Sequence, residues 1–210
     1  MGVDLGGRTS ERTFAHTLDT LKREGSNVLL VGDADAHARA CERLHGDSDD
    51  DSRCHLVVTT DRSVGSVHHQ EGKTEHIVFR PDGRPDDPAV RDVETLDDLG
   101  TEIVDAIDDL EREAGSLDSG ELRVCVDSLE PLLEGHSLEA IFRLLYVVTA
   151  QTRVVDGLGH YHLHRDRSHE TVHLLEPLFD AVVEVRFREG VTEGRWHLRG
   201  QNATSGWLPF

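Results

Sequence analysis

The sequence has no long apolar run and few cysteines. No segment approaches the ~18 apolar residues that a membrane-spanning helix requires, and the first residues, MGVDLGGRTSERTF, contain no apolar signal-peptide core. Cys41, Cys54 and Cys125 are odd in number, widely spaced and without a CxxC pair, so the sequence indicates neither a disulfide framework nor a structural zinc cage. We therefore expect a cytoplasmic protein, without membrane contact, that is held together by ordinary packing.

Lysine is almost absent. Only Lys22 and Lys73 are lysines among 22 basic residues, whereas 41 residues are acidic, which gives a formal net charge of −19. This composition is typical of proteins from salt-in halophiles, because molar salt reduces the Debye length to ~3 Å and so screens repulsion between carboxylates. The alternative is an acidic surface designed to bind basic partners. Basic residues form no run, so a nucleic-acid partner is not expected.

The residues that are present suffice for one domain, which we assign to residues 1–210 with a core over about 10–208. Of the 210 residues, 37% are hydrophobic, and short apolar runs that predict strands alternate with segments of helical periodicity. Strands are predicted near 27–32, 54–60, 75–79, 122–129, 159–164, 181–189 and 195–199, and helices near 10–24, 34–45, 95–114, 137–152 and 168–178. This order predicts an α/β fold with a mostly parallel sheet, helices on both faces and an antiparallel hairpin at the C-terminal edge.

Four segments resemble the RecA superfamily, in particular its KaiC-like branch in archaea. REGSNVLLVG at 23–32 resembles the strand that leads into the phosphate loop of that family, and RVCVDSLEPLL at 123–133 resembles the strand that ends in its magnesium-associated aspartate, here Asp127. LEPLFDAVVEVR at 175–186 and RWHLRGQNATSGW at 195–207 resemble the end of the core and the closing hairpin. The resemblance covers roughly residues 10–208 and implies a RecA-like three-layer fold.

The phosphate-binding residues of that family are missing. A phosphate loop needs glycines, a lysine and a hydroxyl residue, whereas the sequence after Gly32 reads DADAHAR, with His37, Ala38 and Arg39 in the places of the second glycine, the lysine and the hydroxyl residue. Asp33 and Asp35 place carboxylates where a triphosphate would lie. We therefore expect a degenerate phosphate loop, no cofactor and no catalytic residue.

The remaining parts of a nucleotide site are vestigial. The catalytic acidic pair of the family is reduced to Asp61 after Thr60, and the candidates for a remnant pocket are Gly32, Asp33 and Asp127. Asp127 has an alternative interpretation as a strand-end residue that only forms hydrogen bonds. The leading hypothesis is a non-catalytic RecA/KaiC-like module with a binding or regulatory role.

A competing hypothesis is a metal-dependent enzyme. It would use Asp61 and Asp127, or the alternating histidines His160, His162 and His164, whose rings point to one side of a strand. The alternative is the polar side of a strand, and because no Asp-His pattern of metallohydrolases follows, we predict no metal site. Cys125 and Ser128 are interpreted as packing residues.

The chain closes with Trp207 and Phe210. This aromatic tail is expected to dock on its own core or on a neighbouring subunit. We expect a protein partner or a homo-oligomer, and a third hypothesis is a scaffold subunit that supports an active paralogue.

Overall fold

The strands in the described part of the chain form one continuous sheet. The computed structural model describes residues 20–21, 23–45, 53–60, 73–81, 90–200 and 203–210. Among these the order of strands in the sheet is β10-β8-β7-β1-β6-β5-β2-β3-β4, with β9 paired to β8. Strand pairing is parallel from β7 through β1, β6, β5, β2 and β3 to β4, and antiparallel among β7, β8, β9 and β10.

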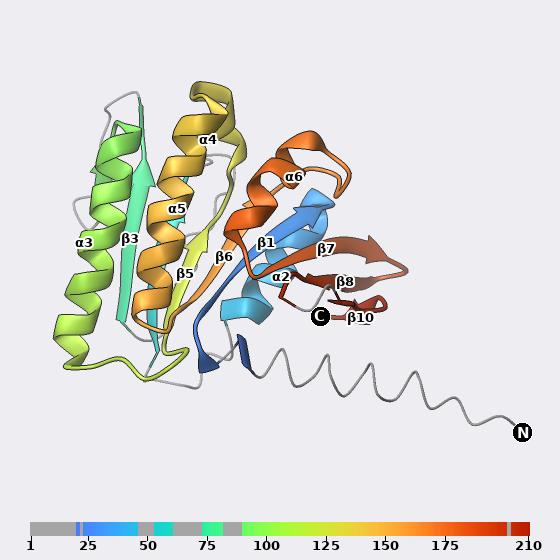
Figure 1. The fold of residues 1–210 in the computed structure, drawn as a ribbon, viewed down its shortest axis with the longest axis horizontal. Coiled ribbons are helices and arrows are strands. Elements are labelled where there is room, and N and C mark those ends of the chain that lie inside the picture. Colours follow the sequence, from blue (N-terminus) through green and yellow to red (C-terminus); the bar gives the residue numbers. More distant parts are fainter. Residues whose placement is uncertain (1–19, 22, 46–52, 61–72, 82–89, 201–202) are drawn as a thin grey trace, which may run out of the picture.

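The elements follow one another along the chain in the order drawn in Figure 1. They are β1 (Ser26–Gly32), α2 (Ala34–His45), β2 (Cys54–Thr59), β3 (Lys73–Phe79), β4 (Arg91–Val93), α3 (Leu96–Ala114), β5 (Leu122–Val126), α4 (Glu130–Gly135), α5 (Leu138–Val154), β6 (Leu158–Leu163), α6 (Glu170–Leu175), the 3-10 helix η1 (Glu176–Leu178), β7 (Ala181–Arg188), β8 (Val191–Leu198), β9 (Ala203–Thr204) and β10 (Leu208–Pro209).

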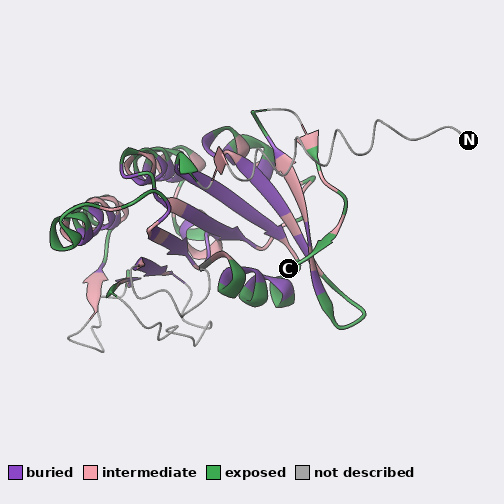
Figure 2. Cartoon of the chain, turned by 90° about the horizontal axis from the view of Figure 1, so that it is seen from below, coloured by how far each residue is buried: buried purple, intermediate pink, exposed green. Residues whose placement is uncertain are grey.

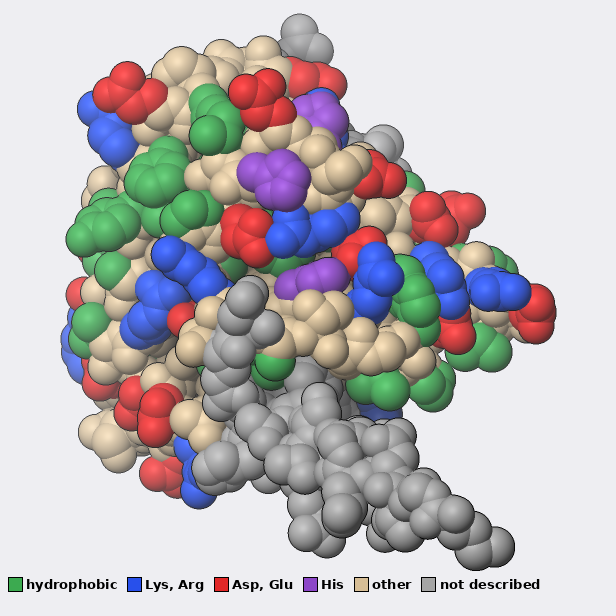
Figure 3. All heavy atoms as spheres, turned by 45° about the vertical axis from the view of Figure 1, so that its right-hand side comes forward, with side chains coloured by type: hydrophobic (Ala, Val, Ile, Leu, Met, Phe, Trp, Pro, Cys, Tyr) green, Lys and Arg blue, Asp and Glu red, His purple; other side chains and the backbone are tan. Residues whose placement is uncertain are grey.

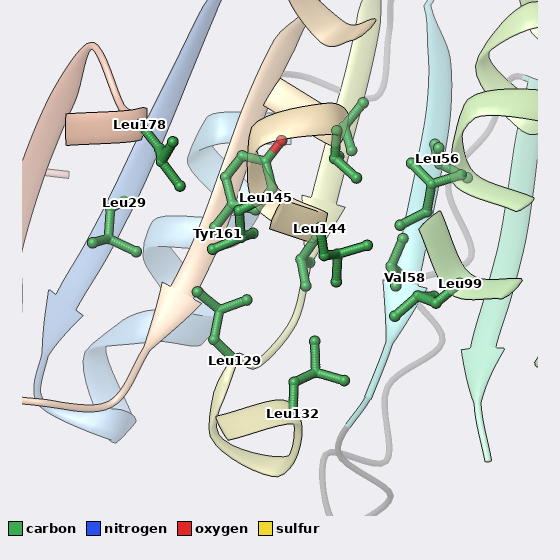
Figure 4. Close-up of a cluster of buried hydrophobic side chains, with 14 of the residues drawn as sticks. Leu29, Leu56, Val58, Leu99, Leu129, Leu132, Leu144, Leu145, Tyr161 and Leu178 are labelled. Atoms are coloured by element: carbon green, nitrogen blue, oxygen red, sulfur yellow. The ribbon is translucent and has the colours of Figure 1, made fainter. Parts of the chain in front are cut away.

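Helices cover both faces of the sheet, and the two faces are unequal. On one face, α3, α5 and α6 cover the larger apolar core, part of which is drawn in Figure 4 with Leu29, Tyr161 and Leu145 pointing into it. On the other face α2 lies over a smaller cluster that includes Leu30, Ala40 and Val183. Figure 2 shows the buried strands between these two layers. The predicted α/β fold, with its parallel sheet, two helical layers and C-terminal hairpin, is confirmed.

Local sequence explains the long helices on the larger face. The N-cap Thr95 accepts a hydrogen bond from the Asp98 amide, and Gly115 ends α3 in the left-handed conformation. Between these caps, apolar residues at helical spacing are buried against the sheet. Ser137 caps α5 in the same way through the Ala140 amide. These signals are local, so α3 and α5 begin and end within two residues of their predicted bounds.

The shortest elements were not predicted from the sequence, and some predicted segments lie outside the described residues. β4 and α4 were not predicted, because a three-residue strand and a six-residue helix are too short to show a period. Of the helix expected at 10–24, residues 20, 21, 23 and 24 lie in the described part; the first three are helical and residue 24 is a bend. The loop expected at 81–88 lies almost wholly outside the described residues. No helix among the described residues has both the length and the apolarity to cross a membrane.

Candidate functional site

The connection between β1 and α2 is one residue long. β1 ends at Gly32 and α2 begins at Ala34, so only Asp33 lies between strand and helix. Gly32 has a φ of 121°, and a Cβ added there would lie 2.2 Å from the carbonyl oxygen of Val185. Close approach of the β7 backbone therefore explains the glycine that the sequence offered as the start of a phosphate loop. We call residues 32–34 the β1–α2 junction.

Backbone amides at the junction are bonded within the protein. The Asp33 amide donates to the Val185 carbonyl at 3.1 Å, and the Ala36 amide donates to the Asp33 carbonyl at 2.9 Å. The Asp33 carboxylate in turn accepts a 3.4 Å hydrogen bond from the Phe187 amide. A phosphate loop needs successive free amides that point toward one anion. The amides of Asp33 and Ala36 do not meet this requirement, because they continue the pairing with β7 and close the first turn of α2.

His37 occupies the space beneath the first turn of α2. Its side chain is only 3% exposed, whereas Ala38 and Arg39 are exposed. Burial, followed by the neighbouring His162 and His164, lowers the pKa of His37 to about 2. His37 is therefore neutral at neutral pH and supplies no positive charge in place of the missing lysine.

Asp127 is bound to the neighbouring strand end. Its Oδ1 accepts hydrogen bonds from the Thr60 amide at 2.8 Å and from the Thr60 hydroxyl at 3.1 Å, and its own amide donates to Val58 at 3.0 Å. These bonds join the ends of β5 and β2. They agree with the interpretation of Asp127 as a strand-end residue, and the other candidate carboxylate, Asp61, lies outside the described residues.

Four sulfur- and nitrogen-bearing side chains meet between α2 and the sheet. Cys41 comes from α2, Cys125 from β5, and His160 and His162 from β6; their potential ligand atoms all lie within 4.8 Å of one another. We call these four residues the Cys/His cluster. All four are buried, at 5%, 2%, 3% and 3% exposure respectively.

The sheet register brings the cluster together. Cys125 and His160 are direct partners in the parallel β5–β6 pairing, and His160 and His162 point to the same face because they are two residues apart on a strand. His37 and Cys41, one helical turn apart, both face the sheet from α2. Cys41 and Cys125 are widely spaced along the sequence, yet the fold places Cys41 Sγ 3.6 Å from Cys125 Sγ.

The contact between the two thiols shifts the pKa of each cysteine. The hydrogen bond from Cys125 lowers the pKa of Cys41, and the same contact, together with burial, raises the pKa of Cys125. Cys41 Sγ also lies 3.4 Å from His160 Nε2, and Cys125 Sγ lies 4.0 Å from His162 Nε2.

The three alternating histidines named from the sequence do not all lie in one cluster. His160 and His162 belong to the cluster, whereas the half-buried His164 follows the end of β6 and packs edge-on against His37, with ring centroids 4.5 Å apart. The cysteines that accompany the first two histidines were missed by the sequence analysis. A signal existed in the sequence: side chains alternate between the two faces of a strand, so Cys125 on β5 and His160 on β6 could be placed on the same face of neighbouring strands.

The aromatic tail docks on its own sheet. Phe210 packs against the smaller apolar cluster and stacks on Trp196, with centroids 6.5 Å apart. The Arg186 and Arg195 guanidinium groups lie 3.8 and 4.8 Å from the centre of the Trp207 ring. Of the two alternatives for the tail, the structure shows docking on the chain itself.

The outer side of α5 carries exposed apolar side chains. Phe142 is 36% exposed, Tyr146 62%, Val147 47% and Val154 75%. A groove of about 500 Å³ between α3 and α5 is lined mainly by apolar groups, including Val104 and Val147. Figure 3 shows acidic and basic side chains next to one another on the face it draws, without a broad basic field.

One family comparison matches this chain. The model of a family described as a family of unknown function, DUF7504, matches residues 25–185. This range contains both the β1–α2 junction and the Cys/His cluster. No curated protein matches the sequence.

Proposed function

Because this chain belongs to the family of unknown function DUF7504, we propose its function from its own residues: it is a RecA/KaiC-like binding or regulatory module that does not hydrolyse nucleotides. The observation that carries the proposal is the β1–α2 junction, in which a single residue separates strand from helix. A nucleoside triphosphate needs a loop of amides at this point, and the amides of Asp33 and Ala36 are bonded to Val185 and to Asp33 itself.

Charge at the junction supports the same proposal. The exposed Asp33 and Asp35 carboxylates lie at the start of α2, where the phosphates of a nucleotide would bind. Coulomb repulsion between unit charges ~4 Å apart is on the order of 4 kcal/mol near a protein surface. The buried neutral His37 does not offset this repulsion.

We propose further that the module acts through contact with protein. The apolar side chains exposed along α5 are the kind of surface that protein partners cover, whereas the aromatic tail already packs on its own sheet. This favours a partner or second copy at α5 over one at the tail.

Isothermal titration with Mg-ATP in molar KCl tests the nucleotide proposal. We expect no heat of binding and no release of phosphate. Micromolar affinity together with turnover would show that the proposal is wrong.

A matched variant tests the physical reason. Ala38→Lys combined with Arg39→Thr restores the cation and the hydroxyl at exposed positions without changing the junction. We expect this double variant to bind Mg-ATP no better than the parent, because the amides stay bonded to β7 and α2. A gain to micromolar binding would mean that the missing lysine, and not the missing loop, is the cause.

A further inference from the structure

The Cys/His cluster has no role in the junction described above. It brings two thiols and two imidazoles from a helix and two strands into one buried volume. Thiolate and imidazole are the ligands that zinc takes in structural sites, four at a time and in tetrahedral geometry. A group of four such ligands from three elements is therefore a complete set for that ion.

The distances fit the geometry of zinc. With Zn–S bonds of about 2.3 Å and Zn–N bonds of about 2.0 Å, the ligand atoms of a tetrahedral site lie about 3.3–3.8 Å from one another. Here the two sulfur atoms are 3.6 Å apart and Cys41 Sγ lies 3.4 Å from His160 Nε2. Cys125 Sγ lies 4.0 Å from His162 Nε2, and every pair is within 4.8 Å. Shifts of a few tenths of an ångström to about 1 Å close the set around one ion.

We propose that Cys41, Cys125, His160 and His162 bind one Zn²⁺ ion in a closed tetrahedral site between α2 and the sheet. Binding replaces the thiol protons, so two protons leave as the ion enters. Two thiolates then balance the charge of the ion, and a neutral complex is compatible with side chains that are at most 5% exposed.

His37 lies where a supporting residue of such a site is needed. Its Nδ1 is 3.0 Å from Nδ1 of His162. If Nε2 of His162 binds zinc, its Nδ1 carries the proton and donates to His37. Zinc-bound histidines usually donate such an outer hydrogen bond, most often to a carboxylate, a carbonyl or water; here His37 takes that place. His37 is thus inferred to be a positioning residue that fixes the orientation of the His162 ring.

The site is structural and not catalytic. Four protein ligands leave no open position for water or substrate, and their burial excludes solvent. The ion would join α2 to β5 and β6 on the face that carries the smaller apolar cluster. The bound ion would therefore add stability on a face where α2 buries a smaller apolar cluster than the helices on the other face.

The test uses the full chain, expressed without a tag and purified in molar KCl without chelator. We expect elemental analysis to find one zinc per chain. After exchange with Co²⁺, we expect the intense visible bands of tetrahedral cobalt and a near-ultraviolet thiolate-to-cobalt band. We also expect a chelator to lower the melting temperature, because the bound ion stabilises only the folded chain.

Matched variants separate ligand loss from core damage. Cys125→Ser and His162→Gln should reduce bound metal to a residual level. Cys54→Ser, with the same 2% exposure as Cys125, and His164→Gln, two residues beyond His162, should each retain one zinc. His37→Leu should weaken zinc binding about 10- to 100-fold, whereas His37→Gln, which keeps an acceptor, should weaken it less.

Three results would overturn the proposal. They are a folded wild-type chain that takes up neither zinc nor cobalt stoichiometrically, a folded chain with a Cys41–Cys125 disulfide in place of metal, and equal metal loss from Cys54→Ser and Cys125→Ser. The cobalt spectrum of the wild type decides the question even if a ligand variant does not fold. Failure of this test leaves the nucleotide titration unaffected, because the junction and the cluster are different groups of residues.

Discussion

Single residues in this protein have roles that their type alone does not indicate. Gly32 could begin a phosphate loop, but its φ of 121° and the nearby Val185 carbonyl show that it permits β7 to approach β1. Asp127 could hold magnesium, yet its carboxylate accepts two hydrogen bonds from Thr60. In each case a neighbour far along the chain determines what the residue does.

Gly32→Ala is expected to destabilise the fold. The positive φ costs an L-residue about 1–3 kcal/mol, and the added Cβ would lie 2.2 Å from a backbone oxygen that no side-chain rotation can move. Denaturant unfolding in molar KCl measures the change in the free energy of unfolding. The control is Gly135→Ala, where a Cβ meets nothing within 4 Å; an equal loss in both variants would contradict the argument.

Among the elements, α2 and α5 differ in what they bury. α2 covers a smaller apolar cluster than the helices on the opposite face, so a metal ion beneath it would matter for stability. α5 packs its inner side on the large core and leaves Tyr146 and Val154 exposed. An amphipathic helix normally presents polar residues to solvent. The apolar outer side of α5 therefore supports the proposed protein partner.

Tyr146→Glu is expected to weaken self-association or partner binding through α5. Tyr146 is 62% exposed, so the change should alter the free energy of unfolding by less than about 0.5 kcal/mol. Light scattering of the parent and the variant measures the mass in solution. Glu139→Gln at the start of the same helix serves as a control.

A parent that is monomeric at all concentrations would rule out self-association through α5. The remaining possibility would then be a different protein as partner, and a pull-down from the native host that Tyr146→Glu does not weaken would contradict it.

At the scale of the whole molecule, the net negative charge is expected to control how stability depends on salt. A net charge of −19 on 210 residues repels itself in dilute buffer, where the Debye length is about 10 Å at 0.1 M salt. Ion pairs such as Arg165–Glu130 and Arg91–Asp109 do not reduce this net charge, because their arginines are already counted in it.

The melting temperature is therefore expected to rise between 0.1 M and molar KCl. Shorter screening lengths reduce the repulsion among carboxylates in the folded state. Circular dichroism during heating at a series of KCl concentrations provides the measurement. A melting temperature that stays constant or falls across the series would rule out charge repulsion as the main effect of salt.

Local patterns in the sequence predict the order of the longer strands and helices along the chain. Apolar period, caps such as Thr95 and Ser137, and terminal glycines act within a few residues, so a linear pattern reports them directly. The sequence also determined which groups are missing after Gly32, because the absence of a lysine does not depend on the fold.

Contacts between residues that are distant in the sequence depend on how the elements pack in three dimensions. Cys41 and Cys125 are 84 residues apart and Cys41 and His160 are 119 apart, yet their side chains are in contact. Those contacts depend on the register of β5 against β6 and on the face over which α2 packs. Register and packing result from the sum of many weak interactions across the sheet, and no short stretch of sequence contains that sum.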